Sequence, residues 1–254
     1  MLLALDIGNT NVVAGVYQGS KWIHQWRADS NPKRPAKNYE IGLGNYLLEK
    51  NIKPNQIERT IISSVVPELT GIFIQVVKRA FQQDPYIIGP QSYSRLKIGV
   101  GNPEEIGTDL VANAVAAFQK CKGHCIVVDF GTALTFTTIS SDGSILGVSI
   151  APGLRTALKA LSDNTAKLPE IHLEMPKSAI GKSTVHALQA GLLFGFKGLV
   201  EAILDQTTSE LGKECTVIAT GGLASVIKPL KKRFDLIDPY LTLEGIRLIE
   251  EQNR

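Results

Sequence analysis

A motif that occurs twice constrains this chain more than any other feature of its sequence. The apolar run 2–5 leads into Asp6-Ile7-Gly8-Asn9-Thr10, and the apolar run 125–128 leads into Asp129-Phe130-Gly131-Thr132. Two further β-rich segments follow in each place, and the two aspartates lie nearly half of the 254-residue chain apart. We therefore predict an internal duplication, in which each half begins with a three-stranded meander and an acidic turn.

Helical periodicity follows each meander. Apolar residues recur at helical spacing from Leu69 to Phe81, after a β-rich run over 60–66, and again over a longer stretch from Leu188 to Leu204. This alternation predicts an α/β protein with two domains, residues 1–118 and 119–254. The longer stripe also contains three glycines, which we attribute to close helix packing: Gly191, Gly195 and Gly198.

Composition argues against several classes of protein. Hydrophobic residues make up 44% of the chain and charged residues 20%, which excludes a disordered chain. No apolar run approaches the ~18 residues that cross a bilayer, and the N-terminus has no basic region of the kind that opens a signal peptide. A net charge of +3 is too small to argue for nucleic acid as a partner. Three cysteines without a CxxC pair fit reduced thiols in the cytoplasm, so we expect no membrane and no nucleic acid.

The acidic turns have the residues that a phosphate site needs. Gly8 lets the backbone approach an anion, and the backbone N–H groups around Asn9 and Thr10 can form an anion-binding nest. Asp6 repels phosphate directly but can hold Mg²⁺ through water, and the metal then bridges phosphate oxygens. One such turn is explained equally well as a tight strand turn with a satisfied aspartate. The second copy, together with the bare backbone of Thr220-Gly221-Gly222, favours a nucleotide clamp.

In this order, the motifs resemble the phosphate 1, phosphate 2 and adenosine elements of the superfamily of acetate and sugar kinases, heat-shock chaperone ATPases and actin. The whole chain is most similar to type III pantothenate kinases. The matching segments extend along the chain: Ser63-Ser64-Val65-Val66-Pro67, Asn102-Pro103-Glu104-Glu105-Ile106-Gly107, Ala112-Asn113-Ala114, Pro152-Gly153-Leu154, Asn164-Thr165-Ala166-Lys167-Leu168-Pro169 and Leu241-Thr242-Leu243-Glu244-Gly245. The resemblance implies two ribonuclease-H-like domains of the actin-like ATPase fold, with a nucleotide cleft between them, usually in a homodimer.

The resemblance also implies an activity and a site. The family phosphorylates pantothenate with ATP, the first step of coenzyme A biosynthesis, and uses Mg²⁺ and a monovalent cation such as potassium or ammonium. Asp129 would bind the monovalent cation, and Asp6 would hold Mg²⁺ through water. The expected ATP contacts are Asp6, Ile7, Gly8, Asn9, Thr10, Asn11, Val12, Val13, Thr132, Gly221 and Gly222. The expected substrate contacts are Val100, Gly107, Thr108, Asp109, Leu110 and Thr184.

Asp109 matches the proton acceptor of the family. We expect it where a loop turns into a helix over 110–118, and an ordinary helix N-cap is the alternative explanation. A carboxylate at this position can accept the proton of a primary alcohol as that alcohol attacks phosphorus.

The sequence departs from the family pattern on the acceptor side. The family motif Gly-x-Asp-Arg ends here in Leu110, and the missing arginine is expected to pair with the pantothenate carboxylate. Val100 stands where the family usually has tyrosine. Three hypotheses stay open: a pantothenate kinase with a replacement cation such as Arg155 or Lys97, a kinase of another small alcohol, and an ATP-binding regulatory protein with weakened catalysis. Retention of Asp6, Asp109 and Asp129 favours an enzyme.

Overall fold

The computed structural model describes residues 1–121, 123–224 and 226–254. The chain divides into two compact units: unit 1 contains Met1–Ala116 and Tyr240–Arg254, and unit 2 contains Ala117–Pro239. The chain first passes from unit 1 to unit 2 after Ala116, close to the expected domain boundary between residues 118 and 119. The C-terminal segment, however, belongs to unit 1, whereas we expected it in the second domain.

Contacts made by α6 (Leu241–Gln252) explain that difference. The helix packs on strands of unit 1, and its Gly245 lies so close to Ala112 that any side chain there would collide with the Ala112 backbone. The hydroxyl of Thr242 donates a hydrogen bond of 2.8 Å to Asn113 Oδ1. The apolar periodicity of the C-terminal segment predicts a helix but does not indicate on which of the two sheets that helix packs.

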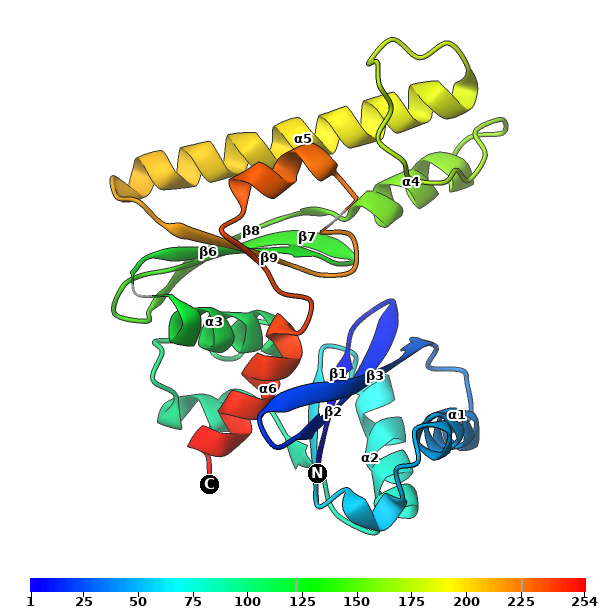
Figure 1. The fold of residues 1–254 in the computed structure, drawn as a ribbon, viewed down its shortest axis with the longest axis vertical. Coiled ribbons are helices and arrows are strands. Elements are labelled where there is room, and N and C mark those ends of the chain that lie inside the picture. The colour runs from blue at the N-terminus through cyan, green and yellow to red at the C-terminus, as the bar shows by residue number, and fades with distance from the viewer. Residues whose placement is uncertain (122, 225) are drawn as a thin grey trace. The chain divides into compact units, whose positions relative to one another are not determined.

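Unit 1 contains a five-stranded sheet in the order β3-β2-β1-β4-β5 (Figure 1). An antiparallel meander forms one side of it, and two parallel strands complete it. The strands are β1 (Leu2–Ile7), β2 (Asn11–Gln18), β3 (Lys21–Asp29), β4 (Arg59–Ser64) and β5 (Tyr86–Ile87).

Helices α1 (Ala36–Glu49) and α2 (Pro67–Phe81) share a core with alternate residues of the central strands. Leu3, Leu5 and Ile7 of β1 all lie in this core, as the two-residue period of a strand requires. Helix α3 (Thr108–Lys120) begins in unit 1 and continues into unit 2. The sheet therefore carries the Asp6 turn on a rigid, fully packed strand.

Unit 2 repeats this arrangement. Its sheet has the order β10-β9-β6-β7-β8, which is the same succession of meander and parallel strands. The strands are β6 (Cys125–Phe130), β7 (Ala133–Ile139), β8 (Ile145–Pro152), β9 (Thr216–Thr220) and β10 (Leu236–Ile237), and the helices are α4 (Leu154–Asp163) and α5 (Thr184–Leu211). Asp6 pairs with Ser63 of β4, and Asp129 pairs with Thr220 of β9 at the equivalent register. The predicted duplication is confirmed.

Two local features differ from what the sequence suggests. The polar, proline-rich composition of 31–38 is typical of a surface loop, but α1 begins within it at Ala36, because Tyr39, Leu43 and Leu47 give the following segment a buried face. The short β-rich run that ends in Thr220-Gly221-Gly222 predicts a helix after it, but the described residues there form turns and a 3-10 helix (Lys228–Arg233). Gly221 has φ +88°, a left-handed conformation that a right-handed helix cannot start from.

The three glycines of α5 also differ from expectation. Gly191, Gly195 and Gly198 are exposed, and beyond their own stretch of helix no atom of the described residues lies within 4 Å of where their side chains would begin, so packing against other elements of this chain does not explain them. Helix α5 is long and apolar enough, by length and composition, to cross a membrane, so the expectation that no apolar run approaches that length was wrong. Its buried residues pack into the core of unit 2, and 33% of its apolar window is buried.

Candidate functional site

The turn at Asp6 is built by hydrogen bonds within unit 1. Gly8 N–H donates to the Asn11 carbonyl at 3.0 Å, and the Ser30 hydroxyl donates to the Gly8 carbonyl at 2.5 Å. Asn9 and Thr10 are exposed at the tip, where a phosphate could meet their donors. Gly8 does not adopt a positive φ. Glycine at this position therefore lets a ligand approach the backbone closely and is not required by the backbone conformation.

The remaining residues of this predicted ATP segment have different surroundings. Asn11 is half-buried, and the side chains of Ile7 and Val12 are fully buried. Val13 is 9% exposed. Only the backbone of these apolar residues is therefore suited to contact a nucleotide, whereas Asn9 and Thr10 present side chains.

A hydroxyl pair connects the Asp6 region to Asp109. Ser63, the parallel neighbour of Asp6 on β4, is fully buried and donates a hydrogen bond of 2.8 Å to Thr108 Oγ1. Thr108 opens α3 and donates in turn to the Ser64 carbonyl at 3.3 Å. The start of α3 is thus held against the strand that lies beside Asp6. Ser63 could not be predicted in this role, because a serine in a β-rich run carries no signal of its own.

Asp109 is the second residue of α3, one position inside the helix. The Val111 N–H bonds to the Gly107 carbonyl, so the helix starts earlier than expected and Asp109 is not its N-cap. Leu110 N–H donates to Asp109 Oδ1 at 2.8 Å. Burial raises the pKa of Asp109, and hydrogen bonds from the backbone partly oppose that shift. A half-buried carboxylate of raised pKa is a stronger base than an exposed one.

The substrate residues predicted beside Asp109 lie along the same segment. Gly107 lies so close to Asp109 Oδ1 that a side chain there would displace the carboxylate. Leu110 and Val100 are half-buried. Thr184, the remaining predicted substrate contact, is exposed in unit 2 at the first position of α5.

The turn at Asp129 is supported differently, by backbone packed against backbone. A side chain at Gly221 would begin 2.6 Å from Asp129 Oδ1 and 2.7 Å from Phe130 backbone atoms. Gly153 N–H donates to the Thr132 carbonyl at 2.9 Å, and a side chain at Gly153 would collide with Gly131 and Thr132. Gly221 and Thr132, both predicted ATP residues, are thus brought to one turn with Asp129. Gly222 follows, exposed to solvent.

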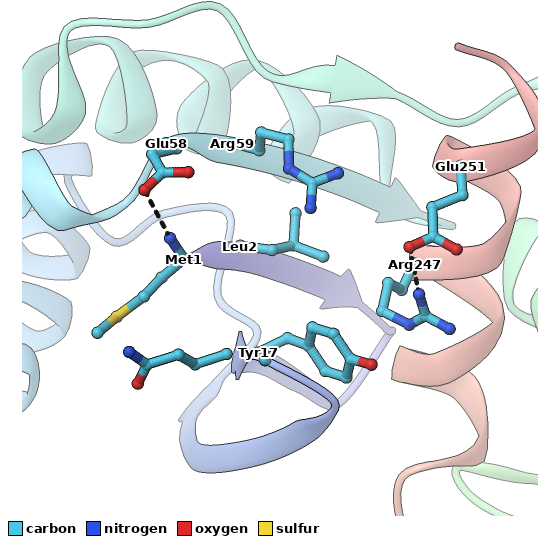
Figure 2. A pocket seen from close by; sticks show the side chains of 9 residues that line it. Met1, Leu2, Tyr17, Glu58, Arg59, Arg247 and Glu251 are labelled. Atoms are coloured by element: carbon cyan, nitrogen blue, oxygen red, sulfur yellow. Dashed lines mark hydrogen bonds and ion pairs between the residues drawn. The ribbon is translucent and has the colours of Figure 1, made fainter.

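A separate pocket of about 270 Å³ opens at the other end of β1 (Figure 2). It is lined by charged side chains that include Arg59, Arg247, Glu58 and Glu251, and it contains none of the predicted site residues. Arg59 donates to Glu250 at 2.9 Å, and Arg247 bonds Glu244 and Glu251. Because these charges already pair within the chain, we do not assign the site to this pocket.

Across the described ranges, no group of three or more His, Cys, Asp or Glu side chains could hold a metal by itself. Mg²⁺ commonly uses one or two carboxylates together with water and substrate phosphates. A single carboxylate at each turn fits that requirement, because the nucleotide would supply the other oxygens.

Comparison with known proteins identifies the family of this chain. A family model described as type III pantothenate kinase matches residues 2–206. A type III pantothenate kinase of Roseiflexus sp. (strain RS-1) is 42% identical over 254 residues, with 100% of both chains covered. One from Syntrophus aciditrophicus is 42% identical over 253 residues, again with 100% of both chains covered. This chain belongs to the type III pantothenate kinase family.

Solved structures confirm the predicted fold for this family member. A Campylobacter jejuni protein assigned to the Baf family of transcriptional activators has a TM-score of 0.59 at 20% identity, covering 99% of this chain and 98% of that one. Component A of (R)-2-hydroxyglutaryl-CoA dehydratase from Acidaminococcus fermentans has a TM-score of 0.53 at 12% identity, covering 100% and 99%. At these identities the likeness concerns the fold alone.

Proposed function

We propose that this chain transfers the γ-phosphoryl group of ATP to the primary hydroxyl of pantothenate, giving 4′-phosphopantothenate and ADP at the start of coenzyme A biosynthesis. The observation that carries the proposal is Asp109. Its carboxylate is half-buried, of raised pKa, and fixed at the start of α3 by Leu110 N–H. Family membership over the full chain supplies the reaction to which such a base belongs.

Asp109 would accept the proton of the attacking hydroxyl. The hydroxyl oxygen forms its bond to the γ-phosphorus while the bond from that phosphorus to the β–γ bridging oxygen breaks, and ADP leaves with the electron pair. The proton on Asp109 then returns to solvent. Because Asp109 must be ionised to act, we expect kcat to fall as the pH drops through its raised pKa.

The two acidic turns would share the nucleotide in this proposal. Residues 6–13 would contact the phosphates through the backbone and through Asn9 and Thr10. Thr132 and the glycines 221–222 would contact the remainder of ATP. Gly221 packs on Asp129 and on the Phe130 backbone with no room for a side chain, and the exposed glycine that follows it, Gly222, leaves backbone open to the nucleotide, which supports this role.

Two cations belong to the proposal. Asp6 would hold Mg²⁺ through water, and the ion would neutralise charge on the phosphates. Asp129 would hold potassium or ammonium, and its Oδ1 borders the space that a side chain at Gly221 would fill. Both are single carboxylates, which suits ions that take most of their oxygen ligands from water and substrate.

The acceptor subsite would comprise Val100, Gly107, Thr108 and Leu110, with Thr184 from α5. Leu110 cannot pair with the pantothenate carboxylate. We propose that a positively charged side chain elsewhere does so, with Arg155 and Lys97 as candidates. Both are exposed. We also propose a cytoplasmic homodimer. The three free cysteines agree with a reducing compartment, and the exposed glycine face of α5 agrees with a second copy packing there.

An acceptor panel tests the proposed function. Purified protein with ATP, Mg²⁺ and K⁺ is assayed for ADP release with pantothenate, with other small alcohols and with no acceptor. We expect ADP release that depends on pantothenate, with phosphopantothenate in equal amount by mass spectrometry. ADP release with another alcohol alone would contradict the proposed acceptor. Nucleotide binding without turnover of any acceptor would favour the regulatory alternative.

A further inference from the structure

A long loop, residues 164–183, connects α4 to α5 within unit 2 and contains neither helix nor strand, although the structure describes every residue of it. It leads directly into Thr184, the first residue of α5 and a proposed acceptor contact. Thr184 and its neighbours Ser183 and Val185 are all exposed, so burial does not hold this turn in place. The N–H groups in the first turn of a helix have no earlier turn to bond, and the turn therefore depends on the contacts that cap it.

One residue of that turn, His186, binds the end of the loop at three places. Its ring Nε2 lies 2.9 Å from the Ser178 carbonyl oxygen, and the Lys182 N–H donates to its Nδ1 at 3.4 Å. A carbonyl oxygen only accepts and a backbone N–H only donates, so these partners fit the neutral ring with its proton on Nε2. The backbone N–H of His186 donates to Ser183 Oγ at 3.3 Å, which is the N-cap of α5.

The loop also packs directly on the helix beside His186. A side chain at Gly181 would begin 2.4 Å from the Ala187 Cα atom, so the loop backbone can approach the helix this closely only with glycine there. The Ile180 N–H donates to Ser178 Oγ at 3.1 Å, which tightens the turn between the two loop residues that the His186 ring binds. The end of the loop and the first turn of α5 are therefore packed together around one imidazole.

We propose that His186 is a positioning residue for the acceptor, which holds the loop end Ser178–Ser183 on the first turn of α5 and thereby keeps Thr184 in place to contact the bound acceptor. His186 itself does not touch the acceptor in this proposal. The inference rests on the proposed function, because Thr184 belongs to the acceptor subsite proposed there. A contact that is fixed before the substrate arrives does not have to be ordered on binding, and losing that preorganisation weakens binding.

Substitution of His186 should act on the acceptor and not on the nucleotide. His186→Ala removes both ring contacts, and we expect it to raise the KM for pantothenate about 5-fold to 10-fold while the KM for ATP stays within about 2-fold of wild type. The amide nitrogen of His186→Gln can donate to the Ser178 carbonyl in place of Nε2. We therefore expect this variant to recover most of the loss, with a KM for pantothenate within about 3-fold of wild type.

Gln189 provides a matched control. Its side-chain amide donates to the His172 carbonyl at 2.9 Å, so it also binds this loop to α5, but farther along the chain from Thr184. Gln189→Ala and His186→Ala should both lower the Tm by about 2–4 °C, because each loses contacts between the loop and the helix. Only His186→Ala should raise the KM for pantothenate. An equal rise in both variants would make His186 a structural residue and overturn the proposal.

A double-mutant cycle with Thr184 tests how His186 acts. Thr184→Ala removes the hydroxyl that is proposed to contact the acceptor. In that background, we expect His186→Ala to raise the KM for pantothenate by no more than about 2-fold, because the contact that His186 positions is already absent. If the two effects on KM multiply instead, His186 does not act through Thr184 and the proposal is wrong.

Failure of this inference and failure of the proposed function give different results. Wild-type protein without pantothenate-dependent ADP release would refute the proposed function itself. A wild type that is active, together with a His186→Ala variant whose KM for pantothenate is unchanged, would overturn the role of His186 alone.

Discussion

The turn at Asp6 in unit 1 and the turn at Asp129 in unit 2 occupy the same place in two sheets of the same topology, yet their supports differ. Unit 1 uses side-chain hydroxyls: Ser30 bonds the Asp6 turn, and Ser63 bonds Thr108 beside the proposed base. Unit 2 uses glycine backbone, with Gly153 and Gly221 packed directly on the turn. The first turn lies beside the strand that holds the start of the Asp109 helix, and the second is closed by packed glycine backbone that leaves Gly222 exposed.

The comparison teaches how one motif can serve two purposes after duplication. The strand-turn-strand unit fixes a carboxylate at the end of a buried strand in both copies. What the neighbouring segments bring to it then differs: the parallel strand of unit 1 reaches the helix that carries Asp109, and the parallel strand of unit 2 ends in Gly221. Substitutions in the two turns and at Asp109 should therefore separate effects on chemistry from effects on binding.

The largest effect should come from unit 1. Asp109→Asn keeps the shape of the side chain and an oxygen to accept from Leu110 N–H, but it cannot take a proton. We expect kcat to fall by a factor of about 10² or more, with little change in ATP affinity. Steady-state kinetics together with calorimetric titration of ATP would measure both. Near-normal turnover would leave Asp109 as a helix-terminal residue only.

The next effect concerns the glycine support of unit 2. Gly221→Ala places a methyl group 2.6 Å from Asp129 Oδ1 at a φ of +88°, so we expect a lower Tm and a KM for ATP raised about 10-fold or more. Gly8→Ala meets only the Asn11 carbonyl at 3.4 Å, and should raise the KM for ATP while the Tm stays close to wild type. Gly71→Ala, with nothing within 4 Å, is the control for both. Equal Tm losses at 8 and 221 would contradict the proposed difference between the turns.

A smaller effect is expected on the acceptor side. Leu110→Arg restores a guanidinium that can pair with a carboxylate, and we expect the KM for pantothenate to fall about 10-fold. The KM for pantothenol, which has no carboxylate, should not change. If the KM values for pantothenate and pantothenol both stay the same, the absence of arginine at position 110 does not weaken pantothenate binding.

The smallest expected effect is on stability against pH. The folded pKa of Asp109 is raised by burial, so its contribution to stability is fully present below the unfolded pKa of about 3.9 and is lost as the pH rises through the folded pKa. Asp109→Asn does not ionise, and its Tm should exceed that of wild type at pH 7 and approach it near pH 4.

Asp142 supplies a control of opposite sign. Its pKa is lowered to about 2, mainly by a hydrogen bond from the Ser140 hydroxyl, so it stabilises the fold above the unfolded pKa and stops doing so as the pH falls toward 2. Asp142→Asn should therefore lower the Tm at pH 7. Equal shifts for the two variants in thermal melts would contradict the buried position of Asp109.

Much of the fold could be predicted from the sequence because the duplicated half shows the same pattern, an apolar strand followed by an acidic turn, a second time. Two copies of one acidic turn predicted two sheets, and the helices over 69–81 and 188–204 had clear periodicity. The position of α6 could not be predicted, since its apolar face fits either unit and only the contact of Gly245 with Ala112 decides. Helix α1 was missed because its first residues are polar.

The site was less accessible to sequence reasoning. The motif around Asp109 could be found through family resemblance, but its raised pKa depends on burial, which no spacing reveals. Ser63 was not predicted, because its role depends on Thr108, which is distant in sequence. Gly153 belongs to a matching segment of the sequence, but its hydrogen bond to Thr132 is visible only in the folded chain.

The most direct test of the account is phosphoryl transfer measured on wild type and Asp109→Asn side by side. Each protein is incubated with ATP, Mg²⁺, K⁺ and pantothenate, and phosphopantothenate is quantified by mass spectrometry. The account predicts one phosphopantothenate per ADP for wild type, and at least about 10²-fold less product for a variant that still binds ATP. No phosphopantothenate from wild type, or equal amounts from both proteins, would contradict it.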